Sequence, residues 1–316
     1  MSKKIQDLAV IGAGPAGLTA AVYTTREDID TTLYEKGVIG GLAAITDWVD
    51  NYPGFSKGIS GLDLAEELRK QAERFGAKIT LGEVSKIEDK GDHRLLTTTD
   101  GDIKAKAVLI ATGTDYKKLG ITGEQEFYGR GVHYCATCDG AFYRDKRLVV
   151  VGGGNSAVQE ALFLTKFATH IDMLVRSKLS ASDVLIEELK KNKKIKVHEG
   201  TTTDQIVGKD KQVEKVVGTH GGKKVEFKTD GVFVFIGLKP NTGFLKDSKI
   251  KLDDYGFVVT DPELSTGMKG VFAAGDVRSG ATMQIASAVG EGATAALRVR
   301  EFLEGKAKDR AEKKQY

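Results

Sequence analysis

Two glycine-rich turns, each set between an apolar strand and a helix, constrain the fold of this chain more than any other feature. The first turn reads Gly12-Ala13-Gly14-Pro15-Ala16-Gly17 and follows the apolar segment 5–11. A helix-forming segment, 18–26, comes next, and residues 31–35 form the expected second strand. This context is typical of dinucleotide-binding folds, whereas the glycine pattern alone is a weak signal. The sequence therefore predicts a βαβ nucleotide-binding unit at the start of the chain.

Each glycine of this turn has its own physical role. Gly12 permits a tight turn, Gly14 lets the backbone approach a pyrophosphate, and Gly17 lets the helix pack closely against the strand. The N-terminus of the helix offers free N–H groups and a partial positive charge to phosphates. Glu35, at the end of the second strand, is placed to accept hydrogen bonds from a ribose. We therefore expect a dinucleotide to bind here.

A second unit of the same kind occurs in the middle of the chain. The strand 147–151 leads into Gly152-Gly153-Gly154-Asn155-Ser156-Ala157. A helix follows to about residue 168, and residues 171–175 form the next strand. Because the motif occurs twice, we expect an α/β fold with two Rossmann-like nucleotide-binding domains and two bound dinucleotides.

Further strands set the expected domain boundaries. Three apolar runs end in small turns, at 107–113, 231–237 and 270–276. The last run precedes an expected helix over 282–303, and we expect both to return to the first domain. The first domain is then discontinuous, comprising residues 1–114 and 245–316. The second domain, residues 115–244, is inserted into it.

The only two cysteines of the 316 residues, Cys135 and Cys138, stand two residues apart. This spacing serves zinc sites, structural disulfides and thiol-exchange centres. Zinc needs about four ligands; His133 is near enough to be a third, but nothing supplies a convincing fourth. A disulfide that closes so short a loop removes little chain entropy from the unfolded state. Thiol–disulfide chemistry is therefore the favoured interpretation, and we expect no metal.

Composition and charge narrow the class of protein. The net charge of +3 arises from basic and acidic residues spread along the chain, so it does not indicate the basic surface patch that nucleic-acid binding requires. The longest apolar runs, such as 232–236, are far shorter than the roughly 20 residues of a bilayer-spanning helix. No secretory signal precedes the first strand. We expect a cytoplasmic protein that binds neither nucleic acid nor membrane, in a compartment where a Cys-x-x-Cys pair is more often catalytic than structural.

Six motifs occur in one order along nearly the whole chain. They are Gly12 to Gly17, Asn51-Tyr52-Pro53-Gly54, Ala111-Thr112-Gly113, Cys135-Ala136-Thr137-Cys138-Asp139, Gly152 to Ala157, and Gly275-Asp276. In this order they resemble the low-molecular-weight thioredoxin reductases, which are FAD-dependent disulfide oxidoreductases. The Cys-Ala-Thr-Cys-Asp motif just before the second glycine-rich turn is the most specific part of the resemblance.

The resemblance implies FAD at the first turn and a pyridine nucleotide in the second domain. Electrons would pass from nicotinamide through the flavin and the Cys135/Cys138 pair to the disulfide of thioredoxin or a thioredoxin-like protein. Cys138 would exchange with the flavin, Cys135 would attack the partner, and Asp139 would protonate the leaving thiolate. A helix-capping role is the alternative for Asp139. By the same resemblance we expect a homodimer.

The cofactor-contacting positions are also implied by the resemblance. The expected FAD residues are Gly12, Gly14, Pro15, Ala16, Gly17, Glu35, Gly40, Gly41, Leu42, Thr46, Asn51, Ala111, Thr112, Gly113, Gly275, Asp276, Gln284, Ile285 and Ala286. The expected residues for the second nucleotide are Gly152, Gly154, Asn155, Ser156, Ala157, Arg176 and Lys178. For the loop residues among them, a plain turn or cap role is an equally good explanation.

The residues expected to select the second nucleotide depart from the family pattern. NADPH-using members carry His-Arg-Arg and a further arginine where this chain has Arg176-Ser177-Lys178 after the strand. Forked guanidinium contacts hold a 2′-phosphate best, so Arg176 and Lys178 are a thin replacement. No acidic residue stands at the strand end for an NADH ribose, and Met283 replaces the family's arginine before Gln284. NADPH is the expected donor, with NADH, reduced ferredoxin or another non-NADPH donor as alternatives.

The sequence thus predicts an FAD-dependent thioredoxin-disulfide reductase. Two other functions stay open. One is a non-catalytic flavoprotein that senses redox state, and the other is an NAD(P)H oxidase that passes electrons to oxygen.

Overall fold

The computed structural model describes residues 5–46 and 48–305. The chain divides into two compact units: unit 1 comprises Met1–Asp115 and Lys239–Tyr316, and unit 2 comprises Tyr116–Leu238. Unit 2 is therefore inserted into unit 1. The chain passes between the units close to the expected boundaries, but Asp115 and residues 239–244, expected in the inserted domain, belong to unit 1.

Unit 1 is built on a sheet whose strands lie in the order β3-β2-β1-β6-β5-β4, with β17 also paired to β6. Its parallel strands are β1 (Gln6–Ile11), β2 (Thr31–Glu35), β3 (Lys78–Leu81), β6 (Gly101–Ile110) and β17 (Val271–Ala273). The antiparallel strands are β4 (Val84–Asp89) and β5 (Arg94–Thr98). Because β2 and β6 flank β1 on opposite sides, the strand order reverses at the end of β1, where doubly wound folds bind their ligands.

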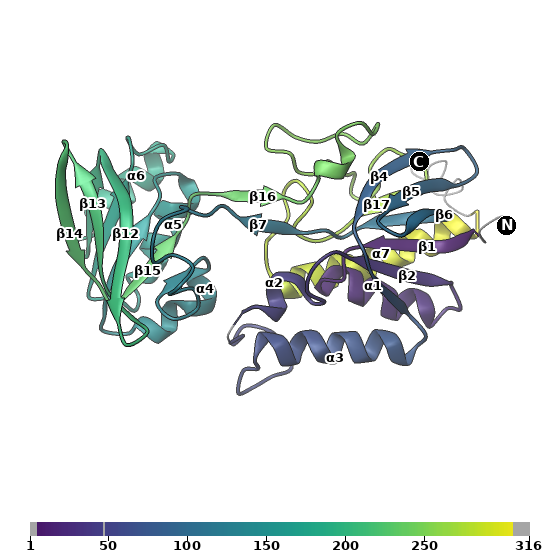
Figure 1. Ribbon diagram of the computed structural model, residues 1–316, viewed down its shortest axis with the longest axis horizontal. Coiled ribbons are helices and arrows are strands. Elements are labelled where there is room, and N and C mark those ends of the chain that lie inside the picture. Colours follow the sequence, from purple (N-terminus) through teal and green to yellow (C-terminus); the bar gives the residue numbers. More distant parts are fainter. Residues whose placement is uncertain (1–4, 47, 306–316) are drawn as a thin grey trace, which may run out of the picture. The chain divides into compact units, whose positions relative to one another are not determined.

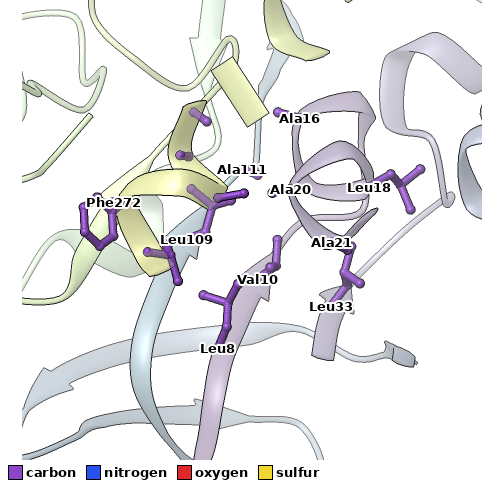
Figure 2. Packing of buried hydrophobic residues seen from close by; sticks show 14 of the residues in the cluster. Leu8, Val10, Ala16, Leu18, Ala20, Ala21, Leu33, Leu109, Ala111 and Phe272 are labelled. Atoms are coloured by element: carbon purple, nitrogen blue, oxygen red, sulfur yellow. The ribbon is translucent and has the colours of Figure 1, made fainter. Parts of the chain in front are cut away.

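Helices cover one face of the unit 1 sheet (Figure 1). They are α1 (Pro15–Thr25), α3 (Gly61–Arg74) and α7 (Ile285–Leu303), with the short α2 (Gly41–Ala44) beside α3. Leu8 and Val10 of β1 pack into the cluster beneath α1, as Figure 2 shows, whereas Ala9 and Ile11 pack on the opposite face. This alternation follows from the two-residue period of a strand. The expected helix over 282–303 begins later, at Ile285, because Met283 has a positive φ of 59°.

Unit 2 contains a parallel sheet with the order β11-β10-β9-β15-β8. Its strands are β8 (Val132–His133), β9 (Arg147–Val151), β10 (His170–Val175), β11 (Ile195–Glu199) and β15 (Gly231–Val234). Helices α5 (Asn155–Leu164) and α6 (Asp183–Lys191) pack with one face of it, to which Leu148 and Val150 contribute. Val149 and Val151 pack on the other face, with residues of an antiparallel sheet. That sheet comprises β12 (Thr201–Lys209), β13 (Gln212–His220) and β14 (Lys223–Lys228).

Short elements complete the chain. They are β7 (Thr114–Tyr116), α4 (Ala136–Asp139), the 3-10 helices η1 (Gly140–Tyr143) and η2 (Gly243–Leu245), and β16 (Leu238–Pro240). Across the described residues, every helix is too short or too polar to cross a bilayer.

Candidate active site

Two glycines of the first turn are required by the packing of unit 1 itself. Gly12 has a φ of 101°, and a Cβ atom there would collide with the carbonyl oxygen of Ala111, the residue directly after β6. A Cβ atom on Gly17 would collide with the carbonyl oxygen of Gly12. The turn, the helix and the neighbouring strand therefore approach one another as closely as backbone allows.

Gly14 is different, because the protein itself does not need a glycine there. Its φ of −79° suits any residue, and no heavy atom lies within 4 Å of the position that a Cβ would take. Gly14 is also the N-cap of α1 and makes no side-chain capping bond. Uncapped N–H groups at the start of α1 thus face open space, which is the arrangement that accommodates a phosphate.

A cavity of about 390 Å³ adjoins this turn at the carboxyl ends of the parallel strands. Gly12, Glu35 and Thr112 line it together with Gly82 and Val84, which follow β3. The Glu35 carboxylate is fixed, since its oxygens accept hydrogen bonds from Ala13 N (2.8 Å) and Gly37 N (2.7 Å). Each oxygen keeps a further lone pair for a ligand hydroxyl.

The loop after β17 carries a second candidate carboxylate for a ligand in unit 1, that of Asp276. Glu291 on α7 accepts a hydrogen bond from Gly275 N (2.7 Å) and pairs with Arg278 (2.6 Å), which fixes this loop. Within the described part of the chain, the side chain of neighbouring Asp276 makes no hydrogen bond to the protein. Burial, and next the negative charge of Glu291, raise the pKa of Asp276 to about 6. A shielded carboxylate without a protein donor fits a ligand that brings its own hydroxyl groups, so the residues present fit FAD.

Among the other expected FAD residues, the polar side chains divide into two groups. Asn51 and Gln284, far apart in the sequence, meet through a hydrogen bond from Asn51 Nδ2 to Gln284 Oε1 (3.1 Å). Gln284 is also the N-cap of α7 and makes no capping bond, and Ile285 and Ala286 form the first turn of that helix. By contrast, the hydroxyl groups of Thr46 and Thr112 donate to protein carbonyls, those of Leu42 and Asn241.

Three predicted FAD residues lie against the first turn by their backbone. Gly40 N donates to Ala13 O (2.7 Å), and a Cβ on Gly41 would lie 3.8 Å from the Cα of Gly14. Ala111 N donates to Ile11 O (2.8 Å). Ala16 is buried, and a Cβ added to Gly275 would lie 3.1 Å from the methyl group of Ala16. The side chain of Ala16 therefore serves packing.

The second turn, in unit 2, repeats the geometry of the first. Gly152 has a φ of 141°, and a Cβ there would collide with Phe235 O. Gly154 is the uncapped N-cap of α5, with a φ of −88° and only Ser180 Oγ at 3.9 Å from an added Cβ. Asn155 is used by the protein, because its Oδ1 accepts a hydrogen bond from Ser182 N (2.8 Å). Ser156 is exposed and Ala157 is buried.

The loop after β10 carries the two cations expected to hold the nucleotide. Arg176 and Lys178 are exposed, and among the described residues neither forms an ion pair. Ser180 N donates to Gly153 O (2.8 Å), which ties the loop to the glycine turn. Leu179 N donates to Glu199 Oε1 (2.7 Å), so an acidic group at the end of β11 supports the same loop.

The cysteine pair begins helix α4 in unit 2. Cys135 and Cys138 form a disulfide, and Cys135 is the N-cap of α4, with its Sγ accepting a hydrogen bond from Cys138 N (3.2 Å). A sulfur held by a backbone N–H at a helix N-terminus is stabilised as a thiolate when the pair is reduced. The capping alternative for Asp139 is wrong, because Cys135 caps α4 and Asp139 makes no capping bond for η1.

Sequence reasoning missed several residues at these sites. His133, considered only as a metal ligand, lies with its Nδ1 3.3 Å from Asp139 Oδ2. Gly82 and Val84 line the unit 1 cavity and Glu291 holds the Asp276 loop. The sequence could have indicated Gly82 and Val84, since they come just after a parallel strand and such residues lie at the ligand-binding edge of the sheet. No local pattern marks His133 or Glu291.

Comparison with known proteins agrees with this geometry. The family model described as pyridine nucleotide-disulphide oxidoreductase matches residues 6–292. Thioredoxin reductases from Listeria monocytogenes and Bacillus subtilis are 42% and 41% identical over 305 residues. Each alignment covers 96% of this chain, and it covers 95% and 96% of those proteins, respectively. The crystal structure of thioredoxin reductase from Streptococcus pyogenes has a TM-score of 0.90 at 40% identity, and the match covers 96% of this chain and 100% of that one.

The matched region contains both glycine-rich turns and the disulfide of Cys135 and Cys138. Similarity therefore extends over the whole arrangement described above rather than over one nucleotide turn. The chain belongs to the pyridine nucleotide-disulphide oxidoreductase family and, within it, to the low-molecular-weight thioredoxin reductases.

Proposed function

We propose that this protein reduces the disulfide of thioredoxin or a thioredoxin-like protein, with FAD in unit 1 and NADPH at the second glycine turn. Membership of the family implies the use of FAD and NAD(P)H. The observation that carries the proposal is the disulfide at the N-terminus of α4 in a chain with two uncapped nucleotide turns. The assignment of thioredoxin rests on similarity to proteins that bear that name.

FAD, when bound, supplies two-electron redox chemistry between the nucleotide and the cysteine pair. The N–H groups at the start of α1 would hold its pyrophosphate, Glu35 would accept from the adenosine ribose, and Asp276 would accept from hydroxyl groups. Asn51 and Gln284 orient each other, which fixes two amide groups on one side of unit 1.

The protein's own chemistry lies at the cysteine pair. Once reduced, Cys135 attacks the disulfide of the partner as a thiolate, favoured by its position at the start of α4. Cys138 then attacks Cys135 Sγ in the mixed disulfide, which restores the disulfide and releases the partner as a dithiol. Asp139 protonates the leaving thiolate.

The donor assignment rests on two exposed cations. Arg176 and Lys178 follow β10 beside the second turn, where the 2′-phosphate of NADPH would need positive charge. Asp172, the acidic residue within β10, is buried and interacts with His198 (2.8 Å) and His170 (3.2 Å). The Asp172 carboxylate is therefore engaged within the protein and does not accept hydrogen bonds from the ribose of NADH.

Anaerobic stopped-flow reduction of the FAD-loaded protein tests the donor. NADPH should bleach the flavin at lower concentration than NADH, and Arg176→Ala should remove that preference. An exposed cation elsewhere on unit 2, Lys193, gives the matched control Lys193→Ala, which should leave it unchanged. Bleaching by neither nucleotide would refute NADPH and NADH together and favour reduced ferredoxin or another carrier.

Two further properties belong to the proposal. We place the protein in the cytoplasm, because a dithiol reductant works where thiols are kept reduced. We also expect a homodimer, which sedimentation of the FAD-loaded protein tests. Thioredoxin turnover, lost in Cys138→Ser, would exclude both the redox-sensor and the oxidase alternatives.

A further inference from the structure

One buried histidine beside the cysteine pair has no role in the reaction described so far. His133 lies on β8, is 8% exposed, and stacks on Phe233 of β15 with ring centroids 5.2 Å apart. The two residues are also paired in register between the strands. A buried imidazole needs a partner for each ring nitrogen, since an unpaired buried polar group destabilises the folded protein.

The two ring nitrogens of His133 connect a carboxylate to a phenol. Nδ1 lies 3.3 Å from Asp139 Oδ2, and Nε2 lies 2.6 Å from Tyr143 Oη. The absence of a side chain on Gly231 makes room for this arrangement, because a Cβ there would overlap the ring of Tyr143. Asp139, His133 and Tyr143 therefore form a line of three exchangeable protons that starts beside Cys138.

The outer end of this line is suited to pass protons without holding charge. Tyr143 is partly exposed, while burial and next the negative charge of Asp139 raise the pKa of its hydroxyl group. Its phenol thus stays neutral, as both donor and acceptor, over the working pH range. The inner end, Asp139, is largely shielded, with 15% of its side chain exposed.

Other titratable groups surround this line. Burial, and next Asp139, raise the pKa of Tyr128 in the segment before β8. Burial raises the pKa of Glu160 on α5, which packs against α4. Asp230 precedes β15, and Lys118 lies over the ring of Tyr128 (4.7 Å).

We propose that His133 and Tyr143 relay protons between solvent and Asp139, and so load and unload the general acid. When Asp139 gives its proton to a leaving thiolate, His133 Nδ1–H passes a proton to Asp139. Tyr143 O–H passes one to Nε2, and solvent replaces the proton on Tyr143. Two enzyme thiols lose a proton each and two partner thiolates gain one each, so the exchange consumes no net proton. The protons of the attacking thiols leave by the same line in reverse.

This inference rests on the proposed disulfide exchange at Cys135 and Cys138, but not on thioredoxin as the partner. It is therefore tested with two small disulfides, mixed anaerobically with the pre-reduced FAD-loaded protein. Hydroxyethyl disulfide has an aliphatic leaving thiol that needs an acid, whereas the aromatic thiol of Ellman's reagent leaves readily without one. Product thiol is followed in time.

Three variants separate a relay from a structural role. Tyr143→Phe removes the solvent end and keeps the contact between His133 and Asp139. His133→Asn keeps a polar group near Asp139 but cannot carry a proton through. His198→Asn is the matched control, because His198 also pairs with a buried aspartate but lies on β11, at the opposite edge of the sheet from β8.

Loss of the relay should slow the aliphatic disulfide roughly 10- to 100-fold, which is less than the roughly 100- to 10,000-fold that a general acid itself contributes. Both relay variants should show this loss, with a changed solvent isotope effect, and neither should slow the aromatic disulfide. When either relay variant is combined with Asp139→Asn, the double variant should reduce the aliphatic disulfide no more slowly than Asp139→Asn alone. Equal slowing of both disulfides, unchanged rates, or additivity with Asp139→Asn would overturn the relay. If the wild type reduces these disulfides but not thioredoxin, only the proposed partner fails.

Discussion

Gly14 separates what the fold requires from what the cofactor requires. An alanine at position 14 meets no protein atom within 4 Å and has an ordinary φ of −79°, so the apoprotein should fold normally. The new methyl group would, however, stand where we place the FAD pyrophosphate. Loss of one hydrogen bond to a charged group costs about 1.5–3 kcal/mol, which corresponds to a rise of roughly 10- to 150-fold in the Kd for FAD.

Two matched variants make this prediction sharp. Gly17→Ala places a methyl group against Gly12 O and should lower the stability of the apoprotein by about 1–3 kcal/mol through overpacking. Gly154→Ala introduces the same small group at the open turn of unit 2. It should leave the FAD affinity unchanged and weaken reduction of the flavin by the pyridine nucleotide.

The assay combines thermal melts of the apoproteins with fluorescence titration of FAD. Gly14→Ala should melt like the wild type and bind FAD weakly, and Gly17→Ala should melt at a lower temperature. Wild-type FAD affinity in Gly14→Ala would show that the pyrophosphate does not lie over this turn. A melt as low as that of Gly17→Ala would show that Gly14 serves the fold.

Further expectations follow for other residues. Because the folded-state pKa of Asp276 is raised to about 6, its ionisation destabilises the folded apoprotein as pH rises from about 4 to 6. Asp276→Asn should therefore raise the apoprotein Tm more at pH 7.5 than at pH 5. An equal gain in Tm at both pH values would contradict the raised pKa. Arg94 is 1% exposed and donates to Lys269 O (2.6 Å) and Asp89 (2.7 Å), so Arg94→Met should cost about 2–3 kcal/mol in urea unfolding of the apoprotein without changing its FAD affinity. Asp139→Asn should slow reduction of an aliphatic disulfide by roughly 100-fold or more while leaving flavin reduction intact, and an unchanged rate would remove Asp139 as the acid.

Much of the fold was predictable because strand periodicity and glycine turns are local signals. Strand β2 at 31–35 and strand β9 at 147–151 match the expected segments. The apolar run 231–237 contains strand β15, which ends at Val234, and the turn after it includes Gly237, with a positive φ of 103°. The start of α7 was also misplaced, because nothing in the sequence marks Met283 as a residue with positive φ.

The site was predictable only where a motif carries the chemistry. The cysteine pair and both turns are motifs, and the chain places each at the start of a helix. Asn51 and Gln284 could be named from resemblance, but their hydrogen bond depends on the return of the chain to unit 1 after the insertion. His133 and Tyr143 meet through a single strand pairing and a missing side chain at Gly231, so no local pattern could reveal them.

The central claim is that Cys135 and Cys138 carry electrons from the flavin to the disulfide of a partner. A single-turnover experiment tests it most directly: anaerobically reduced, FAD-loaded protein is mixed with oxidised thioredoxin, and new thiols on thioredoxin are counted. The wild type should produce a thioredoxin dithiol and recover its own disulfide, whereas Cys138→Ser should stop at a mixed disulfide through Cys135. Equal yields of thioredoxin dithiol from the wild type and Cys138→Ser would contradict the account.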